Sequence, residues 1–206
     1  GAQTSLIIGT AVTFIAILIG APIGIIAGYF GGRLDTLLMR VSDVFLAFPP
    51  LLLPIAITAA LGSGLGNAMF AIAVSWFPWY ARITRAAVLR IRTEPYINAA
   101  RAMGVSHTRI MWRHVLPNSL TPIIVQGSMD FGFTILAAAS LSFIGLGATP
   151  PMIEWGLMAA TSRSMFLDAW WTVLFPGMAI FFTVLCVNLV GDGVRDVLDP
   201  KHGIKE

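Results

Sequence analysis

Charge is scarce in this sequence. Only 11% of its 206 residues are charged and 57% are hydrophobic, whereas about a quarter of the residues of a typical soluble domain are charged. So little polar surface cannot cover a water-exposed globule, and a lipid bilayer is the expected solvent for much of the chain. Cysteine is also nearly absent, and the single Cys186 excludes both an internal disulfide and a multi-cysteine metal site.

The gaps between the charged residues predict where the chain crosses a membrane. A helix needs about 20 apolar residues to span the hydrocarbon core. The third predicted helix continues past Arg82 and Arg85, whose long stems can reach the interface. We expect an all-α integral membrane protein in which residues 1–206 form a single transmembrane domain. Its five predicted spans cover approximately residues 5–30, 44–61, 69–88, 120–146 and 170–190.

Basic residues lie almost entirely on one side of this predicted bundle. Of the 13 lysines and arginines, 12 fall in the 31–43 segment, the 81–119 segment or the C-terminal segment, and only Arg163 falls on the opposite side. Because basic residues concentrate in cytoplasmic loops, we predict that these segments and the C-terminus are cytoplasmic. Gly1 is not an initiator methionine, so we expect a fragment or processed form with an earlier span before it.

The 94–117 segment is a compact basic insert between apolar spans. Pro95 suits the first turn of a helix, and Gly104 suits a position just past a helix end. Ser106 can cap a second short helix, and Pro117 is expected to break or restart the helix that enters the next span. One surface of this hairpin is predicted to be small and tight, and the other basic. The small surface comprises Ala99, Ala100 and Met103.

Two interpretations of the insert follow from its residues. Arginines beside a membrane can hold an interfacial hairpin to anionic lipid. Alternatively, small residues allow a cytoplasmic protein to approach closely, and arginines favour an acidic groove on that protein. Nucleic acid is a poor third partner because the arginines alternate with apolar residues.

The residue pattern of the insert is specific. "NAARAMG" is followed by nine residues and then by "HVLPN". This resembles the EAA loop of ABC-importer permeases, which has the form Glu-Ala-Ala, three residues, Gly, nine residues, Ile-x-Leu-Pro. Asn98 replaces the glutamate and His114 replaces the isoleucine. The "HVLPN" ending is similar to the oligopeptide/dipeptide/nickel branch of the family. The matching positions are Ala99, Ala100, Gly104, Leu116 and Pro117.

The resemblance covers nearly the whole chain, in the order of the second permease of such systems. It extends to "AGYFGGRLD", "LMRVSDVFLAFP", "LSFIGLG", "PPMIEWGLM" and "NLVGDGVRDVLDP". It implies a type I ABC-importer permease core, with six helices in the family and cytoplasmic EAA coupling helices. It also implies a location in the inner membrane of a prokaryote. The residues that would couple to an ATPase are Asn98, Ala99, Ala100, Arg101, Met103, Gly104, His114, Leu116 and Pro117.

The resemblance further implies a transport subunit that is not itself an enzyme. Its partners would be a homologous permease, two cytoplasmic ATPase subunits, an extracytoplasmic binding protein and membrane lipid. ATP and Mg²⁺ would bind to the ATPases, so no cofactor, catalytic residue or metal ligand is expected in this chain. The expected cargo is a dipeptide or oligopeptide, with nickel or another metal chelate as the alternative. A channel or structural membrane protein would not need a partner-shaped hairpin.

Three further features have both a structural and a functional interpretation. Gly20, Gly24 and Gly28 recur every four residues and favour close helix packing, although a pathway role is also open. Pro49 and Pro50 interrupt the second predicted span and could expose carbonyls to a transport pathway. Asp130, the only acidic residue within a predicted span, could line that pathway or reach interfacial water.

Overall fold

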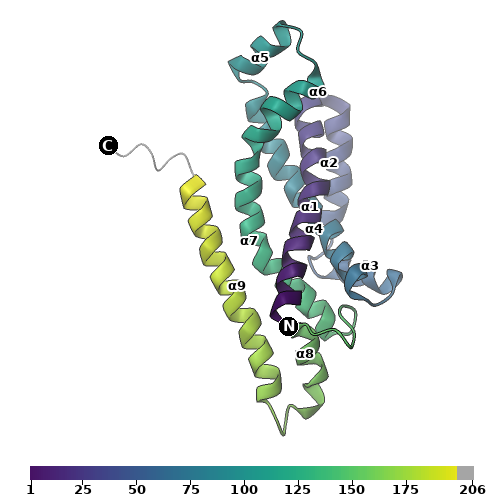
Figure 1. Ribbon diagram of the computed structural model, residues 1–206. Helices are drawn as coiled ribbons and strands as arrows, with labels where there is room; N and C mark the ends of the chain where they lie inside the picture. The colour runs from purple at the N-terminus through teal and green to yellow at the C-terminus, as the bar shows by residue number, and fades with distance from the viewer. Residues whose placement is uncertain (199–206) are drawn as a thin grey trace. The chain divides into compact units, whose positions relative to one another are not determined.

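The computed structural model describes residues 1–198, and every regular element in that range is helical (Figure 1). The prediction of an all-α protein is confirmed. In chain order the elements are α1 (Ala2–Phe30), α2 (Gly32–Leu46), α3 (Leu52–Leu61), α4 (Leu65–Ile91), α5 (Pro95–Ala102), α6 (His107–Ile110), the π-helical turn η1 (Met111–Val115), α7 (Leu116–Phe143), α8 (Trp155–Thr161), the 3₁₀ turn η2 (Arg163–Met165) and α9 (Trp171–Leu198).

Three helical segments among residues 1–198 are long and apolar enough to cross a membrane. They are Ala2–Phe30, His107–Phe143 and Trp171–Leu198. These correspond to the first, fourth and fifth predicted spans. The second predicted span is only partly helical and the third is helical, but neither lies on one of these three segments.

The predicted 44–61 span is divided between α2 and α3, which are separated by residues 47–51. Pro49 and Pro50 lie in this break. A proline lacks a backbone N–H, and the residue before it is driven out of the α region, so two adjacent prolines end the helix instead of only kinking it. Helix α2 also covers residues that we expected to form a cytoplasmic loop. Helix α2 contains charged residues, so the gaps between charges did not predict it.

The predicted 69–88 span is part of α4, which has 27 residues and continues past Arg82 and Arg85 as expected. The arginines do not simply extend to an interface. Each pairs with an aspartate of α2, as Arg82–Asp43 and Arg85–Asp35. Helix α4 therefore meets α2 through a charged face, which explains why it is not uniformly apolar.

The chain forms two compact units. Unit 1 comprises Gly1–Ile15, Pro49–Ser75 and the chain from Gly127 onward, and unit 2 comprises Ala16–Phe48 and Trp76–Gln126. Within unit 1, the Thr134 hydroxyl lies 3.3 Å from the hydroxyl of Thr13 and donates to the carbonyl of Gly9 at 3.3 Å. These contacts tie the start of α1 to the middle of α7.

Glu154 organises the start of α8 in unit 1. Its buried carboxylate accepts hydrogen bonds from the backbone N–H groups of Gly156 at 2.8 Å and Leu157 at 2.9 Å. The Ser5 hydroxyl contacts the same carboxylate at 3.4 Å. Capping satisfies amide groups that the first turn of a helix cannot pair internally, so Glu154 fixes α8 and connects it to the start of α1.

In unit 2, α1 packs closely against α4 along a stripe of small residues. A Cβ atom at Gly24 would overlap the backbone oxygen of Ala81 and lie 2.7 Å from the Cβ of Thr84. Gly20 and Gly28 approach α4 in the same way, one turn before and one turn after. The contacts support the packing interpretation of this stripe, because only glycine leaves room for the two backbones at this distance.

Candidate functional site

The basic hairpin, residues 95–115, stands at one end of unit 2 (Figure 1). Its turn is a Schellman motif, in which Gly104 N–H donates to Arg101 O at 3.0 Å and Val105 N–H donates to Ala100 O at 3.1 Å. Gly104 has a φ of 76°, the left-handed conformation expected for a glycine just past a helix end. The predicted turn is thus confirmed at the level of individual hydrogen bonds.

The helix starts of the hairpin also follow the sequence prediction, with one exception. Pro95 occupies the first turn of α5. Ser106 holds the N-cap position of α6 in an extended conformation, but its side chain forms no capping hydrogen bond with any described residue. The position of the cap was therefore predicted correctly, whereas its hydrogen bond was not.

A hydrophobic cluster beneath the hairpin fixes one face of it to the ends of α1 and α4. Val105 and Met111, both partly buried, pack against this cluster. Contacts of this kind join the hairpin helices to the membrane helices as one packed body. The buried members are Tyr29, Val88, Ile91, Ile97, Ala100, Ile110 and Val115.

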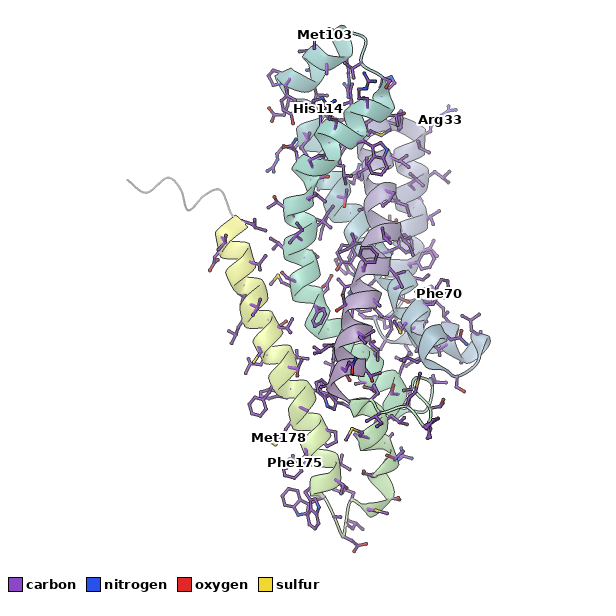
Figure 2. The ribbon with its side chains drawn as sticks, viewed as in Figure 1. Arg33, Phe70, Met103, His114, Phe175 and Met178 are labelled. Carbon is purple, nitrogen blue, oxygen red and sulfur yellow. The ribbon has the colours of Figure 1, made fainter. Side chains whose placement is uncertain are left out.

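Ala100 corrects the predicted small surface of the hairpin. We expected Ala100 to lie beside Ala99 and Met103 on one face, but it is 5% exposed and belongs to the cluster. Successive helical residues are about 100° apart around the axis, so the two alanines face different directions. Ala99 is exposed and Met103 is 76% exposed at the tip (Figure 2).

Most of the predicted coupling residues are exposed, either on the hairpin or at the start of α7 just after it. Leu116 is only half-exposed, at the start of α7, and His114 is half-buried with its ring centroid 6.2 Å from that of Tyr96. The exposed predicted residues are Asn98, Ala99, Arg101, Met103, Gly104 and Pro117.

Pro117 neither breaks nor restarts the helix, contrary to expectation. Helical structure runs without interruption from His107 to Phe143, with the π-helical turn η1 just before the proline. In an α-helix the proline ring would collide with the carbonyl four residues earlier, that of Arg113. The wider π turn contains this carbonyl and relieves the collision. The Asn118 side chain donates to the next carbonyl, that of His114, at 2.6 Å.

Two ion pairs between α2 and α4 were not predicted from the sequence. Arg85 donates to both carboxylate oxygens of Asp35, at 2.5 and 2.7 Å. The Arg82–Asp43 pair, at 2.6 Å, is more exposed. The hydrogen bonds from Arg85 hold the pKa of the Asp35 carboxyl below its usual value. The aspartates of residues 32–46 could have indicated these pairs, but only if that segment had been predicted as a helix beside α4.

The predicted pathway residues lie on separate elements of unit 1. Pro49 and Pro50 are exposed in the turn between α2 and α3. Asp130 is half-buried near the middle of α7. Their role in a pathway stays a prediction.

Neither histidine of the hairpin belongs to a metal-binding cluster. Among residues 1–198, no group of three or more histidine, cysteine or acidic side chains converges as a metal site. His107 contacts Tyr29, and His114 lies beside Tyr96. The hairpin thus presents exposed small and basic side chains, and its other face is packed against the cluster at the ends of α1 and α4.

The chain is similar to known transport-system permeases along nearly its whole length. The chain is 50% identical over 201 residues to a dipeptide transport system permease protein of Alkalihalophilus pseudofirmus, covering 98% of this chain and 66% of that protein. It is 48% identical over 206 residues to a probable D,D-dipeptide transport system permease protein of Escherichia coli, covering all of this chain and 69% of that protein. The chain therefore spans about two thirds of the length of these relatives.

A solved structure shares the fold of this chain, and a family model matches most of its length. The inward-facing methionine ABC transporter MetNI superimposes with a TM-score of 0.77 at 20% identity, over 97% of this chain and 94% of that chain. Residues 20–203 match the family described as the binding-protein-dependent transport system inner membrane component. This chain belongs to the family of binding-protein-dependent transport system inner membrane components.

Proposed function

We propose that this chain is the permease subunit of an ATP-driven peptide importer, coupled to cytoplasmic ATPases through the outer surface of the basic hairpin. The observation that carries the proposal is the exposed surface around Ala99, Arg101 and Met103, on a hairpin whose opposite face is packed into a core. Small residues permit close approach, and the exposed hairpin arginines Arg109 and Arg113 favour an acidic partner groove. The names of the peptide-transport relatives support a peptide as the cargo.

The proposed assembly contains one homologous permease, two ATPase subunits and an extracytoplasmic binding protein, within a prokaryotic inner membrane. The hairpin, the other basic segments and the C-terminus face the cytoplasm. Arg195 lies near the end of α9, whereas Lys201 and Lys205 lie outside the described residues. Anionic lipid contacts the basic side, and nucleic acid is not a partner.

The coupling mechanism follows from the way the hairpin is mounted. When ATP closes the two ATPase subunits, the hairpins docked on them move together. Because the hairpin core includes residues from the ends of α1 and α4, this movement shifts membrane helices instead of bending a loose loop. The binding protein then releases its peptide into the opened pathway. ATP hydrolysis occurs in the ATPases, and this chain contributes no catalytic group.

The proposed function predicts the subunit composition of the complex and the molecule that it transports. The detergent-solubilised complex should contain two permeases and two ATPases, and liposomes containing it should take up a labelled dipeptide when ATP and the binding protein are present. Mass measurement of the complex and uptake counting are the readouts. Uptake of nickel but not dipeptide would favour the metal-chelate alternative, and a transporting monomer without an ATPase would refute the proposal.

A second prediction tests the pathway role proposed for Asp130. A carboxylate in the middle of a membrane helix is costly and usually faces a cavity or partner. Asp130→Asn is nearly isosteric and removes only the charge. We expect altered uptake kinetics for the dipeptide, with assembly and basal ATP hydrolysis at the normal level. Unchanged uptake kinetics would remove Asp130 from the pathway.

A further inference from the structure

Tyr29 connects the last turn of α1 to the basic hairpin. It is 5% exposed, and its hydroxyl lies 2.9 Å from Nδ1 of His107, the first residue of α6. The two rings are also in edge-on contact, with centroids 5.7 Å apart. A buried phenol hydroxyl usually requires a hydrogen-bond partner, and this one finds it on the hairpin, 78 residues along the chain.

The same ring also contacts the other helix of the hairpin. The guanidinium carbon of Arg101, in the last turn of α5, lies 5.0 Å from the centroid of the Tyr29 ring. This is the geometry of a cation–π interaction. One side chain of α1 therefore holds both hairpin helices, α5 through Arg101 and α6 through His107.

Two neighbouring contacts reinforce this attachment at the end of α1. Arg92, just before α5, donates to the carbonyl of Gly28 at 2.8 Å. The ring of Phe30 lies 6.2 Å from that of His107. The last carbonyls of a helix have no partner within it, so Arg92 satisfies one of them and ties the connection between α4 and α5, which leads into the hairpin, to the end of α1.

We infer that Tyr29 is the positioning residue that transmits hairpin movement to α1 during transport. This inference rests on the proposed coupling function. Tyr29 is buried beneath the hairpin and not on its outer surface, so it acts on the membrane side of the joint and does not contact the ATPase. Its hydroxyl is the specific element, because phenylalanine would preserve the ring packing and the contact with Arg101 but not the hydrogen bond to His107.

The test is Tyr29→Phe in the complete transporter, reconstituted in liposomes with its binding protein. We expect ATPase co-purification at the wild-type level. The number of labelled dipeptides imported per ATP hydrolysed should fall roughly 3- to 10-fold, the effect of losing one hydrogen bond from a coupled movement. An unchanged ratio would overturn the inference. A fall accompanied by loss of the ATPase would also overturn it, because Tyr29 would then only maintain the docking surface.

A double-mutant cycle distinguishes transmission through this one contact from general loosening. His107→Ala removes the partner while leaving the buried ring in place. The Tyr29→Phe/His107→Ala protein should be no worse than the more affected single variant, whereas additive losses would refute a shared contact. Should Tyr29→Phe not reach the membrane, His107→Ala carries the same expectation and the same refutation.

The matched control is Thr36→Val, which removes a hydroxyl that donates within α2, to Gly32 O at 3.1 Å. It should leave the ratio of import to hydrolysis unchanged. A wild-type preparation that contains no ATPase would contradict the proposed function itself. That outcome is distinct from an unchanged ratio in Tyr29→Phe.

Discussion

Replacing Gly24 with alanine is expected to destabilise the protein by about 3 kcal/mol, the upper part of the usual range for overpacking. The added Cβ would overlap the backbone oxygen of Ala81 and crowd the Cβ of Thr84. A backbone atom cannot move aside by changing rotamer, so α1 and α4 must separate and lose contacts on both sides of the substitution. Thermal unfolding in detergent and the amount of protein in the membrane are the measurements.

Gly177→Ala is the matched control for this substitution. Gly177 also lies in an apolar helix, α9, but a Cβ there would meet no described atom within 4 Å. We expect wild-type stability or a small gain, because alanine is the better helix former. Equal melting temperatures for Gly24→Ala and the wild type would show that the two helices do not pack as closely as described.

Replacing Gly104 with valine is expected to uncouple ATP hydrolysis from transport while the protein still inserts. A β-branched residue with a φ of 76° is strained by roughly 1–3 kcal/mol. The Schellman hydrogen bonds of Gly104 and Val105 would weaken, and the turn between α5 and α6 would change. A Cβ at Gly104 would meet no described atom within 4 Å, so the side chain would extend from the surface that we assign to the ATPase.

The readouts for Gly104→Val are ATPase co-purification and dipeptide-stimulated hydrolysis in liposomes. The control is Gly62→Val, in the turn between α3 and α4. Gly62 also has a positive φ, 95°, and open space around it. Valine there also imposes backbone strain, but at a position outside the hairpin, so coupling should be normal. Normal coupling in Gly104→Val would contradict the assignment of the hairpin as the joint.

Local rules predicted the turns of the hairpin well. Pro95 and Gly104 occupy the positions that their backbone preferences favour. The range of φ open to proline and to glycine depends on the residue type itself, so the sequence is enough to predict these positions. The direction of each side chain depends on tertiary packing, which the motif does not contain. Ala100 matches the sequence motif, but its side chain was predicted on the outer face and lies in the core cluster.

The membrane helices show the corresponding limit of hydropathy. Uniformly apolar helices such as α1 and α9 were found from the gaps between charges. Helix α2 was missed because it contains charged residues. Its aspartates pair with arginines of α4 that lie 39 and 50 residues later in the chain, which hydropathy does not show. Pro117 was expected to interrupt the helix because its own backbone preference does not reveal the π turn that precedes it.

The first two adjacent alanines of the "NAARAMG" stretch, Ala99 and Ala100, differ in which other residues must change when they are replaced. Ala99 faces outward, so the fitness effect of replacing it depends on the ATPase sequence that it meets, under the proposed coupling. A change in that second protein can compensate for it. Ala100 faces the core that includes Tyr29 and Val88, and only changes within this chain can accommodate a larger residue there. Under the proposed coupling, one short motif thus places a residue whose replacement can be compensated in a second protein next to a residue whose replacement must be compensated within this chain.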